Sequence, residues 1–165
     1  MMKKLFIDYD ICSKCEKCLV RCSYIFHPDN NGIISLRELV GFLFVCRRCD
    51  DYPCVNACPN NALERKDGVI KRSNFLCISC KSCAMACPFG TIEFEWLEYL
   101  TSICDVCTGA RIAEKERFSC INSCPYGALK IIEQDDIKED VFIHKINENI
   151  VVKAFCWTQF YELKK

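Results

Sequence analysis

The pattern of apolar and polar residues predicts short strands joined by tight turns. Residues 91–94 and 128–132 have partly alternating polarity, which is typical of strands with one buried face. The Asp67-Gly68 dipeptide separates the segments Leu63–Lys66 and Val69–Arg72, and it favours a tight β-hairpin between them. We therefore expect small sheets built from short strands.

Residues 23–45 form an insertion that begins with turn-forming residues and ends in an apolar run at residues 39–45. We expect a structural loop here, with a partner-binding surface as the alternative. The apolar run is strand-sized and falls well short of the roughly 18 residues that a membrane span needs. His27 lies in this insertion, and we do not expect it to be a ligand. No membrane span is expected.

Residues 133–165 form a C-terminal extension whose later part is rich in large apolar side chains. Such a surface is more than a small preceding core could cover, so we expect the extension to be helical and to dock on a partner or on a second copy. The alternative is that it packs across its own chain. Cys156 lies in this extension and is expected to be a small buried thiol.

Composition narrows the classes of function. The chain has 165 residues, with 22 basic and 22 acidic residues, so its zero net charge gives no reason to expect nucleic-acid binding. The apolar run at residues 5–7 is too short for a signal peptide, and we expect a cytoplasmic protein. Seventeen cysteines are far more than a chain of this size usually carries, which indicates either metal binding or a disulfide scaffold.

Sixteen of the cysteines fall into four groups of four, and only Cys156 stands apart. The groups are Cys12, Cys15, Cys18, Cys22; Cys46, Cys49, Cys54, Cys58; Cys77, Cys80, Cys83, Cys87; and Cys104, Cys107, Cys120, Cys124. Cysteines three apart are poorly placed for disulfides with good geometry. The third group has the C-x-x-C-x-x-C-x-x-x-C-P spacing of bacterial ferredoxins, in which three thiolates hold one cluster and the fourth holds its neighbour.

The other groups vary this spacing. The first group keeps it without the proline, the second widens the middle gap to four residues, and the fourth widens it to twelve. Zinc takes four tetrahedral ligands and has no use for a three-cysteine ladder with a donated fourth, although a zinc site stays an alternative for the fourth group alone. Basic residues inside the ligand loops are either solvated charges or local influences on a cluster. They are Lys14, Lys17, Arg47, Arg48 and Lys81.

An internal repeat follows the last cysteine of the second, third and fourth groups. Each has Cys-Pro, then two variable residues, then Ala or Thr, then Leu or Ile. The four-residue step before this cysteine is about one helical turn, and the proline ends the helix because it cannot continue the hydrogen-bonding pattern. The repeat predicts a short helix, a turn and a short strand.

From about residue 5 to residue 132 the order of spacings resembles that of four-cluster polyferredoxin subunits. These subunits serve molybdenum or tungsten pterin oxidoreductases, hydrogenases and carbon monoxide dehydrogenase. The resemblance implies an α+β fold of two nested bacterial-ferredoxin-like modules, with short strands and helices around four 4Fe-4S clusters. Residues 1–45 with 95–132 would form the first module, residues 46–94 the second, and residues 133–165 the extension.

The resemblance also implies the ligand set of each cluster, with every fourth ligand crossing to another group. The sets are Cys12, Cys15, Cys18 with Cys124; Cys22 with Cys104, Cys107, Cys120; Cys46, Cys49, Cys54 with Cys87; and Cys58 with Cys77, Cys80, Cys83.

The function implied is a relay of single electrons between a catalytic redox subunit and a further donor or acceptor. The chain has no dinucleotide or phosphate motif and no placeable acid–base pair, so it is not expected to be catalytic alone. The expected partner is a tungsten or molybdenum pterin enzyme such as an aldehyde oxidoreductase, followed by hydrogenase, formate dehydrogenase and carbon monoxide dehydrogenase. Further copies of the chain or a second redox subunit are additional partners. The alternatives are a free polyferredoxin carrier and a structural zinc protein.

Overall fold

The computed structural model describes residues 3–22, 32–97, 104, 118–137 and 140–157. The chain divides into two compact units. Unit one comprises Met1–Leu36 and Ser102–Phe155, and unit two comprises Arg37–Thr101 and Cys156–Lys165. Both are built from short helices and small sheets, so the fold is a small α+β fold. In the described part of the chain, no helix combines the length and apolar composition that a membrane crossing requires.

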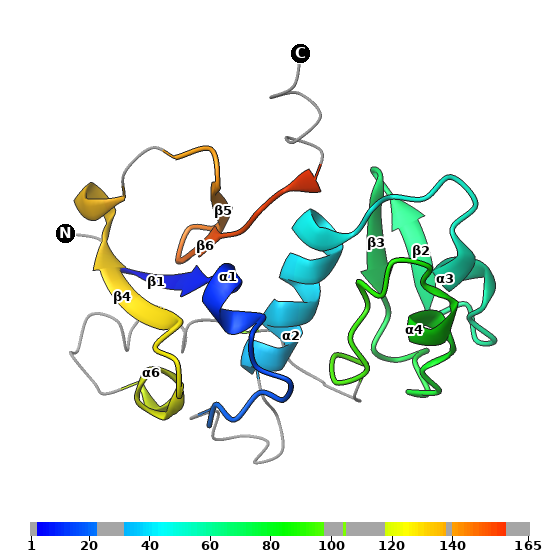
Figure 1. Ribbon diagram of the computed structural model, residues 1–165, viewed down its shortest axis with the longest axis horizontal. Helices are drawn as coiled ribbons and strands as arrows, with labels where there is room; N and C mark the ends of the chain where they lie inside the picture. The colour runs from blue at the N-terminus through cyan, green and yellow to red at the C-terminus, as the bar shows by residue number, and fades with distance from the viewer. Residues whose placement is uncertain (1–2, 23–31, 98–103, 105–117, 138–139, 158–165) are drawn as a thin grey trace. The chain divides into compact units, whose positions relative to one another are not determined.

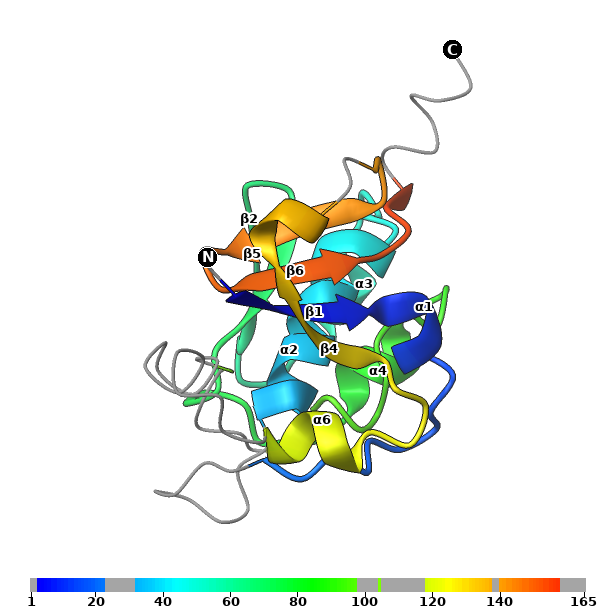
Figure 2. The ribbon, with the colours of Figure 1, turned by 90° about the vertical axis from the view of Figure 1, so that its left-hand side faces the viewer.

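Unit one contains a four-stranded sheet in the order β4-β1-β6-β5. Its strands are β1 (Lys3–Asp8), β4 (Leu129–Glu133), β5 (Ile143–Asn147) and β6 (Ile150–Lys153). β1 pairs antiparallel with β4 and parallel with β6, and β6 pairs antiparallel with β5. Figure 2 shows β1 and β6 side by side in the middle of the sheet. The sheet therefore joins the beginning of the chain to two distant segments.

The sequence of each central strand accounts for its place. In β1 the side chains of Leu5 and Ile7 are buried while Phe6 between them is only partly covered, as expected for a pleated strand. The Ile-Val-Val run of β6 is buried throughout, which suits a central strand of β-branched residues. β4 confirms the strand expected at residues 128–132, which begins one residue later at Leu129.

The expectation of a helix in the C-terminal extension is wrong for the residues between 143 and 153. They form β5 and β6, joined by a tight turn in which the Asn149 amide donates to the Asn147 side chain at 2.9 Å. The β-branched residues of β6 can bury their side chains against β1, and this favours a strand over a helix. Residues 158–165 lie outside the described part.

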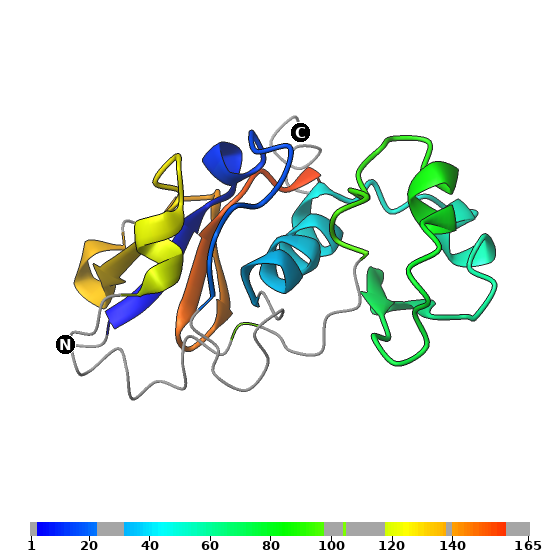
Figure 3. The same cartoon turned by 90° about the horizontal axis from the view of Figure 1, so that it is seen from below.

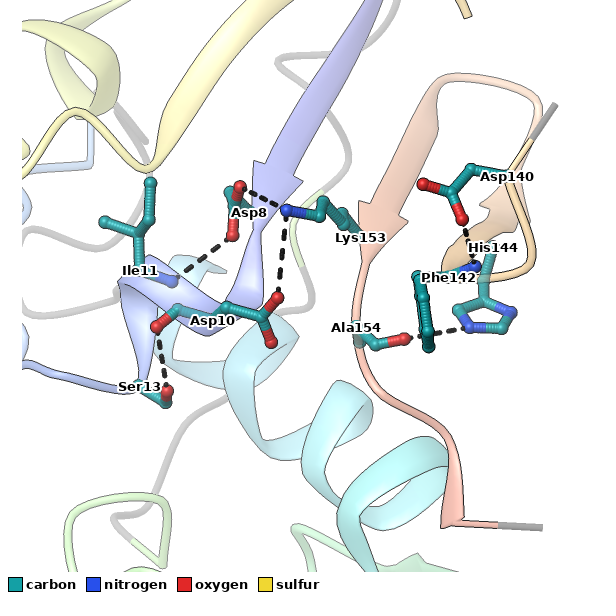
Figure 4. A network of polar contacts seen from close by, with 9 residues as sticks. All are labelled: Asp8, Asp10, Ile11, Ser13, Asp140, Phe142, His144, Lys153 and Ala154. Atoms are coloured by element: carbon teal, nitrogen blue, oxygen red, sulfur yellow. Dashed lines mark hydrogen bonds and ion pairs between the residues drawn. The ribbon is translucent and has the colours of Figure 1, made fainter. Parts of the chain in front are cut away.

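Short helices and the ion pairs of Lys153 complete unit one. The helices are α1 (Tyr9–Cys12), the 3-10 helix η2 (Gln134–Asp136) and α6 (Ser119–Ser123). Asp8 caps α1 by accepting a hydrogen bond from the Ile11 amide at 3.2 Å. The second oxygen of Asp8 lies 3.3 Å from Lys153 Nζ at the end of β6, so this carboxylate ties the first cysteine loop to the extension (Figure 4).

Unit two contains the hairpin of β2 (Leu63–Lys66) and β3 (Val69–Arg72), which confirms the hairpin expected around Asp67-Gly68. Asp67 and Gly68 have φ values of 54° and 76°, as the tightest hairpin turns require at both central positions. The helix α3 (Pro53–Asn56) packs against β2 and against α4 (Ser82–Ala86) (Figure 1, Figure 3). α3 contains Cys54 of the second cysteine group, and α4 contains Cys83 of the third.

Two local expectations are wrong. The loop expected at residues 23–45 lies partly outside the described residues, and its remainder forms α2 (Gly32–Val40) and the π-helix η1 (Gly41–Val45). Ile33, Leu36 and Val40 are all buried and recur at helical spacing, which explains the helix. Residues 91–94 form a bend and a turn instead of a strand. There the carboxylate of Glu93 binds Arg37 at 2.8 Å, and that of Glu95 binds it at 3.3 Å.

The core of unit two is small and includes thiols. Its buried residues pack into one cluster: Phe42, Cys54, Leu63, Ile70, Cys83, Ala84, Ile92 and Leu97. Trp96 is 1% exposed, and its indole ring occupies the space that a side chain at Gly41 would need. A core with so few large side chains gains little stability from apolar burial alone, so a bound group that draws the cysteines together would add substantially.

Candidate metal centres

The cysteine-proline repeat has the same local structure at each of its three positions. The helices α3, α4 and α6 end just before Cys58, Cys87 and Cys124. Each of these cysteines donates its backbone amide to the carbonyl three residues earlier, at 3.1 to 3.4 Å. The short helix and turn expected from the repeat are therefore confirmed.

The turn after each proline is also repeated. The third residue after the cysteine is in the left-handed region and donates its amide back to the cysteine carbonyl. The φ values are 50° at Asn61, 61° at Gly90 and 63° at Gly127. Asparagine and glycine are the residues that tolerate this conformation best.

A cavity in unit two is lined by four cysteines from two groups. Cys46, Cys49 and Cys54 come from the second group and Cys87 comes from the third. We call this the first cavity.

The thiols of the first cavity interact electrostatically. Burial, together with the charges of Cys46 and Cys87, raises the pKa of Cys54 to about 11. Burial also raises the pKa of Cys46, with Cys49 and Cys87 adding to the increase. Four thiolates could share this site only if bound metal neutralised their mutual repulsion.

Cys87 differs from Cys46 and Cys54 because its environment favours the thiolate. Burial acts to raise its pKa, but hydrogen bonds from the Thr91 hydroxyl and from nearby backbone amides lower it overall. The Thr91 oxygen lies 3.4 Å from the Cys87 sulfur. Donors of this kind stabilise charge on a ligand sulfur.

A second cavity in unit two is lined by Cys58, Cys77, Cys80 and Cys83. The Ala62 amide donates to the Cys58 sulfur at 3.2 Å. Burial raises the pKa of Cys83, and the thiolates of Cys58 and Cys77 contribute. Cys80 is exposed, and hydrogen bonds from the side chain and amide of Ser82 lower its pKa. We call this the second cavity.

Each cavity also contains buried donors without a hydrogen-bond partner. These are Arg47 Nε and Arg48 Nε at the first cavity, and Arg72 Nη1 and Ser79 Oγ at the second. Buried polar groups are normally satisfied, so orphaned donors in a thiol-lined cavity indicate room for an acceptor. An anionic cluster with inorganic sulfide is such an acceptor.

The backbone of the two cavities repeats one unusual feature. Arg48 and Ser79 occupy the position just before Cys49 and Cys80, and their φ values are 55° and 56°. Left-handed conformations are uncommon outside glycine and concentrate at functional sites. In the described residues, no three side chains of cysteine, histidine, aspartate or glutamate converge on a single-ion site. The cysteines surround a volume, and this donor set fits an iron-sulfur cluster.

The structure brings the neighbours of the first and fourth cysteine groups together in unit one. The Arg21 amide, next to Cys22, donates to the Ser123 hydroxyl, next to Cys124, at 2.8 Å. Gly32 approaches the backbone of Cys104 so closely that a Cβ there would lie 3.0 Å from the Cα of Cys104.

The remaining expected ligands of unit one are also located, with one exception. Cys12 is buried at the end of α1, Cys15 and Cys18 follow it in the connecting loop, and Cys120 is in α6. Cys107 lies outside the described residues, as does His27.

Sequence reasoning did not identify Arg72 or Ser79 as cavity residues. Ser79 could have been found because it occupies the same position in a C-x-x-C step as Arg48. Arg72 is five residues before the nearest cysteine, Cys77, and reaches the second cavity only through the hairpin. No pattern in the sequence near Arg72 indicates that it lines the cavity.

A small α+β fold with cysteine-lined cavities of this kind defines a ferredoxin-like iron-sulfur protein. The chain belongs to the 4Fe-4S dicluster domain family, whose family model matches residues 39–134. It is therefore an iron-sulfur electron-transfer protein and not an enzyme in its own right, as expected. Its cofactors are 4Fe-4S clusters.

Relatives of the chain carry names of the same class. Formate hydrogenlyase subunit 2 of Escherichia coli is 28% identical, with 83% of this chain and 85% of the relative covered. An uncharacterized ferredoxin of Methanocaldococcus jannaschii is 31% identical over 83% of this chain and 76% of its own length. A probable anaerobic dimethyl sulfoxide reductase chain of Escherichia coli is 28% identical over 81% and 75%.

Proposed function

We propose that the chain is an electron-transfer subunit that carries four 4Fe-4S clusters. In unit two, one cluster is held by Cys46, Cys49, Cys54 and Cys87, and another by Cys58, Cys77, Cys80 and Cys83. The single observation that carries the proposal is that each of these sets lines its own cavity, including the cysteine that crosses from the other group.

The same crossing is proposed for unit one, which makes the two modules nested. One cluster is held by Cys12, Cys15, Cys18 and Cys124, and the other by Cys22, Cys104, Cys107 and Cys120. Two contacts support this pairing: β1 precedes the first group and pairs with β4 after the last, and Arg21 binds Ser123. Both contacts bring a segment next to the first group beside a segment next to the last.

The residues of the chain hold the clusters, orient them and limit the access of water. Bound clusters supply reversible one-electron chemistry, and no bond to a substrate is needed. Backbone amides such as that of Ala62 and hydroxyls such as that of Thr91 donate to ligand sulfurs. Buried arginine side chains add positive charge beside anionic sites. Each of these contacts would stabilise the reduced form of a bound cluster, because reduction adds negative charge.

The proposed partner is a catalytic redox subunit, with further copies or a second redox subunit as the other end of the relay. A tungsten or molybdenum pterin enzyme such as an aldehyde oxidoreductase is the first candidate, followed by hydrogenase, formate dehydrogenase and carbon monoxide dehydrogenase. The formate hydrogenlyase and dimethyl sulfoxide reductase relatives support the role of a subunit. The relative named as a ferredoxin favours a second candidate function, that of a free polyferredoxin carrier. A cytoplasmic location is part of the proposal because ligand thiolates must stay reduced.

Purification of the tagged chain from its native host without oxygen tests the proposal. We expect a stoichiometric complex in which metal analysis finds iron together with tungsten, molybdenum or nickel. Tungsten or molybdenum would identify a pterin enzyme, and nickel would identify a hydrogenase or carbon monoxide dehydrogenase. An iron-loaded chain without any partner would favour the free carrier. A chain without iron would contradict both.

A further inference from the structure

Arg47 lies over two aromatic rings at the edge of the first cavity. Its guanidinium carbon lies 3.1 Å from the centre of the Trp157 ring and 5.5 Å from the centre of the Phe89 ring. Its Nε is buried without a hydrogen-bond partner, and the residue follows directly on the ligand Cys46. Two aromatic faces restrain a cation that would otherwise extend into solvent.

The charges around the two cavities of unit two differ. The first cavity is lined by Arg47, Arg48 and Arg65, and none of the described residues that line it is a carboxylate. The second cavity is lined by two cations, Arg72 and Lys81, and Arg72 is neutralised by Glu38, whose two oxygens accept hydrogen bonds at 2.6 and 2.9 Å. The first cavity therefore has more uncompensated positive charge.

A fixed cation affects the reduction of a nearby cluster. Reduction adds one electron, supplied by the redox partner, to a cluster that is already anionic with its four thiolates, and no bond is made or broken. A guanidinium held in a poorly solvated position favours the more negative, reduced form. The same group in bulk solvent is screened by water and salt.

We infer that Trp157 and Phe89 hold Arg47 in place to raise the reduction potential of the first-cavity cluster above that of the second-cavity cluster. The inference rests on the proposed function, because it requires clusters in both cavities. Trp157 acts through Arg47 and is a positioning residue. Trp157, in the C-terminal extension, then has a defined role in unit two. An added electron would reside mainly on the first-cavity cluster, because that cluster has the higher reduction potential.

Redox titration of the anaerobic holoprotein, followed by electron paramagnetic resonance, tests the inference. We expect Arg47→Gln to lower the potential of one cluster and to leave the others unchanged. Trp157→Ala lowers the same potential by a smaller amount because the guanidinium is released into solvent. Trp157→Phe and Arg47→Lys keep most of the wild-type value. Lys71→Gln is the control, because it removes a positive charge from an exposed position on β3.

Iron and sulfide are counted in every variant. If Arg47→Gln loses a cluster, the potentials of Trp157→Ala and Trp157→Phe are compared instead, since both variants keep the arginine. A lower potential in Trp157→Ala alone supports the inference. The inference would be overturned if Arg47→Gln and Trp157→Ala changed the potentials no more than the control Lys71→Gln does. Wild-type protein without iron in unit two would contradict the proposed function instead.

Discussion

The Arg21 amide and the Ser123 hydroxyl form a 2.8 Å hydrogen bond, although 102 positions separate them in the chain. The contact brings the end of the first cysteine group beside the end of the fourth. It is the local counterpart of the pairing between β1 and β4. Both contacts support the proposal that these two groups belong to one module.

Crossed ligation in unit one predicts which cysteine variants affect the same cluster. We expect Cys124→Ser to lose about four irons, because a cubane cluster has four. Adding Cys15→Ser should cost little more, since both cysteines hold one cluster, whereas adding Cys107→Ser should remove a second cluster. Iron and sulfide counts measure these losses. The reverse pattern, with Cys107→Ser redundant and Cys15→Ser additive, would refute the crossing.

Gly41 is predicted to be indispensable for the packing of unit two. A Cβ at this position would overlap the far edge of the Trp96 indole, formed by atoms Cζ2, Cζ3 and Cη2. We expect Gly41→Ala to reduce stability by about 1–3 kcal/mol, as for other overpacked cores. Adding Trp96→Phe, which removes that edge, should restore part of the loss. Anaerobic denaturation measures both, and no rescue would mean that the cause lies elsewhere.

The buried pair of Glu38 and Arg72 is predicted to stabilise unit two and to lower the potential of the second-cavity cluster. The two side chains are 9% and 2% exposed. Removing one partner of such a pair costs about 3–5 kcal/mol because the other is left buried and charged. Glu38→Gln should therefore lower the melting temperature and also raise the second-cavity potential. Glu64→Gln, on the exposed face of β2, is the control.

Residues 133–155 of the C-terminal extension are predicted to be an integral part of unit one. Val152 is fully buried in β6, and the neighbouring Lys153 makes a partly exposed ion pair with Asp8. Val152→Ala should cost about 2 kcal/mol of stability. Lys153→Met should cost less than about 1 kcal/mol, because exposed pairs contribute little. Equal effects in denaturation would contradict the role of β6 as a central strand.

Local signals in the sequence predicted the local structure well. The hairpin at Asp67-Gly68 and the turn after each Cys-Pro depend on residues whose backbone preferences are strong. Ligand spacing indicated iron-sulfur chemistry because three cysteines at three-residue steps, followed by a fourth, suit paired clusters and do not suit one tetrahedral zinc ion. These features depend on neighbours within a few positions.

Long-range features could not be predicted in the same way. β6 is a strand because it meets β1, which lies more than 140 positions away, and its apolar residues alone did not exclude a helix. At residues 91–94, Glu93 forms an ion pair with the distant Arg37, and the nearer of the two rings at Arg47 is that of the distant Trp157. In each case the partner comes from a distant segment that a local pattern does not reveal.

Metal analysis of the anaerobically purified chain tests the central claim most directly. Four 4Fe-4S clusters predict a brown protein with about sixteen irons and as many sulfides per chain, and without stoichiometric zinc. A colourless protein that contains zinc and no sulfide would contradict the account.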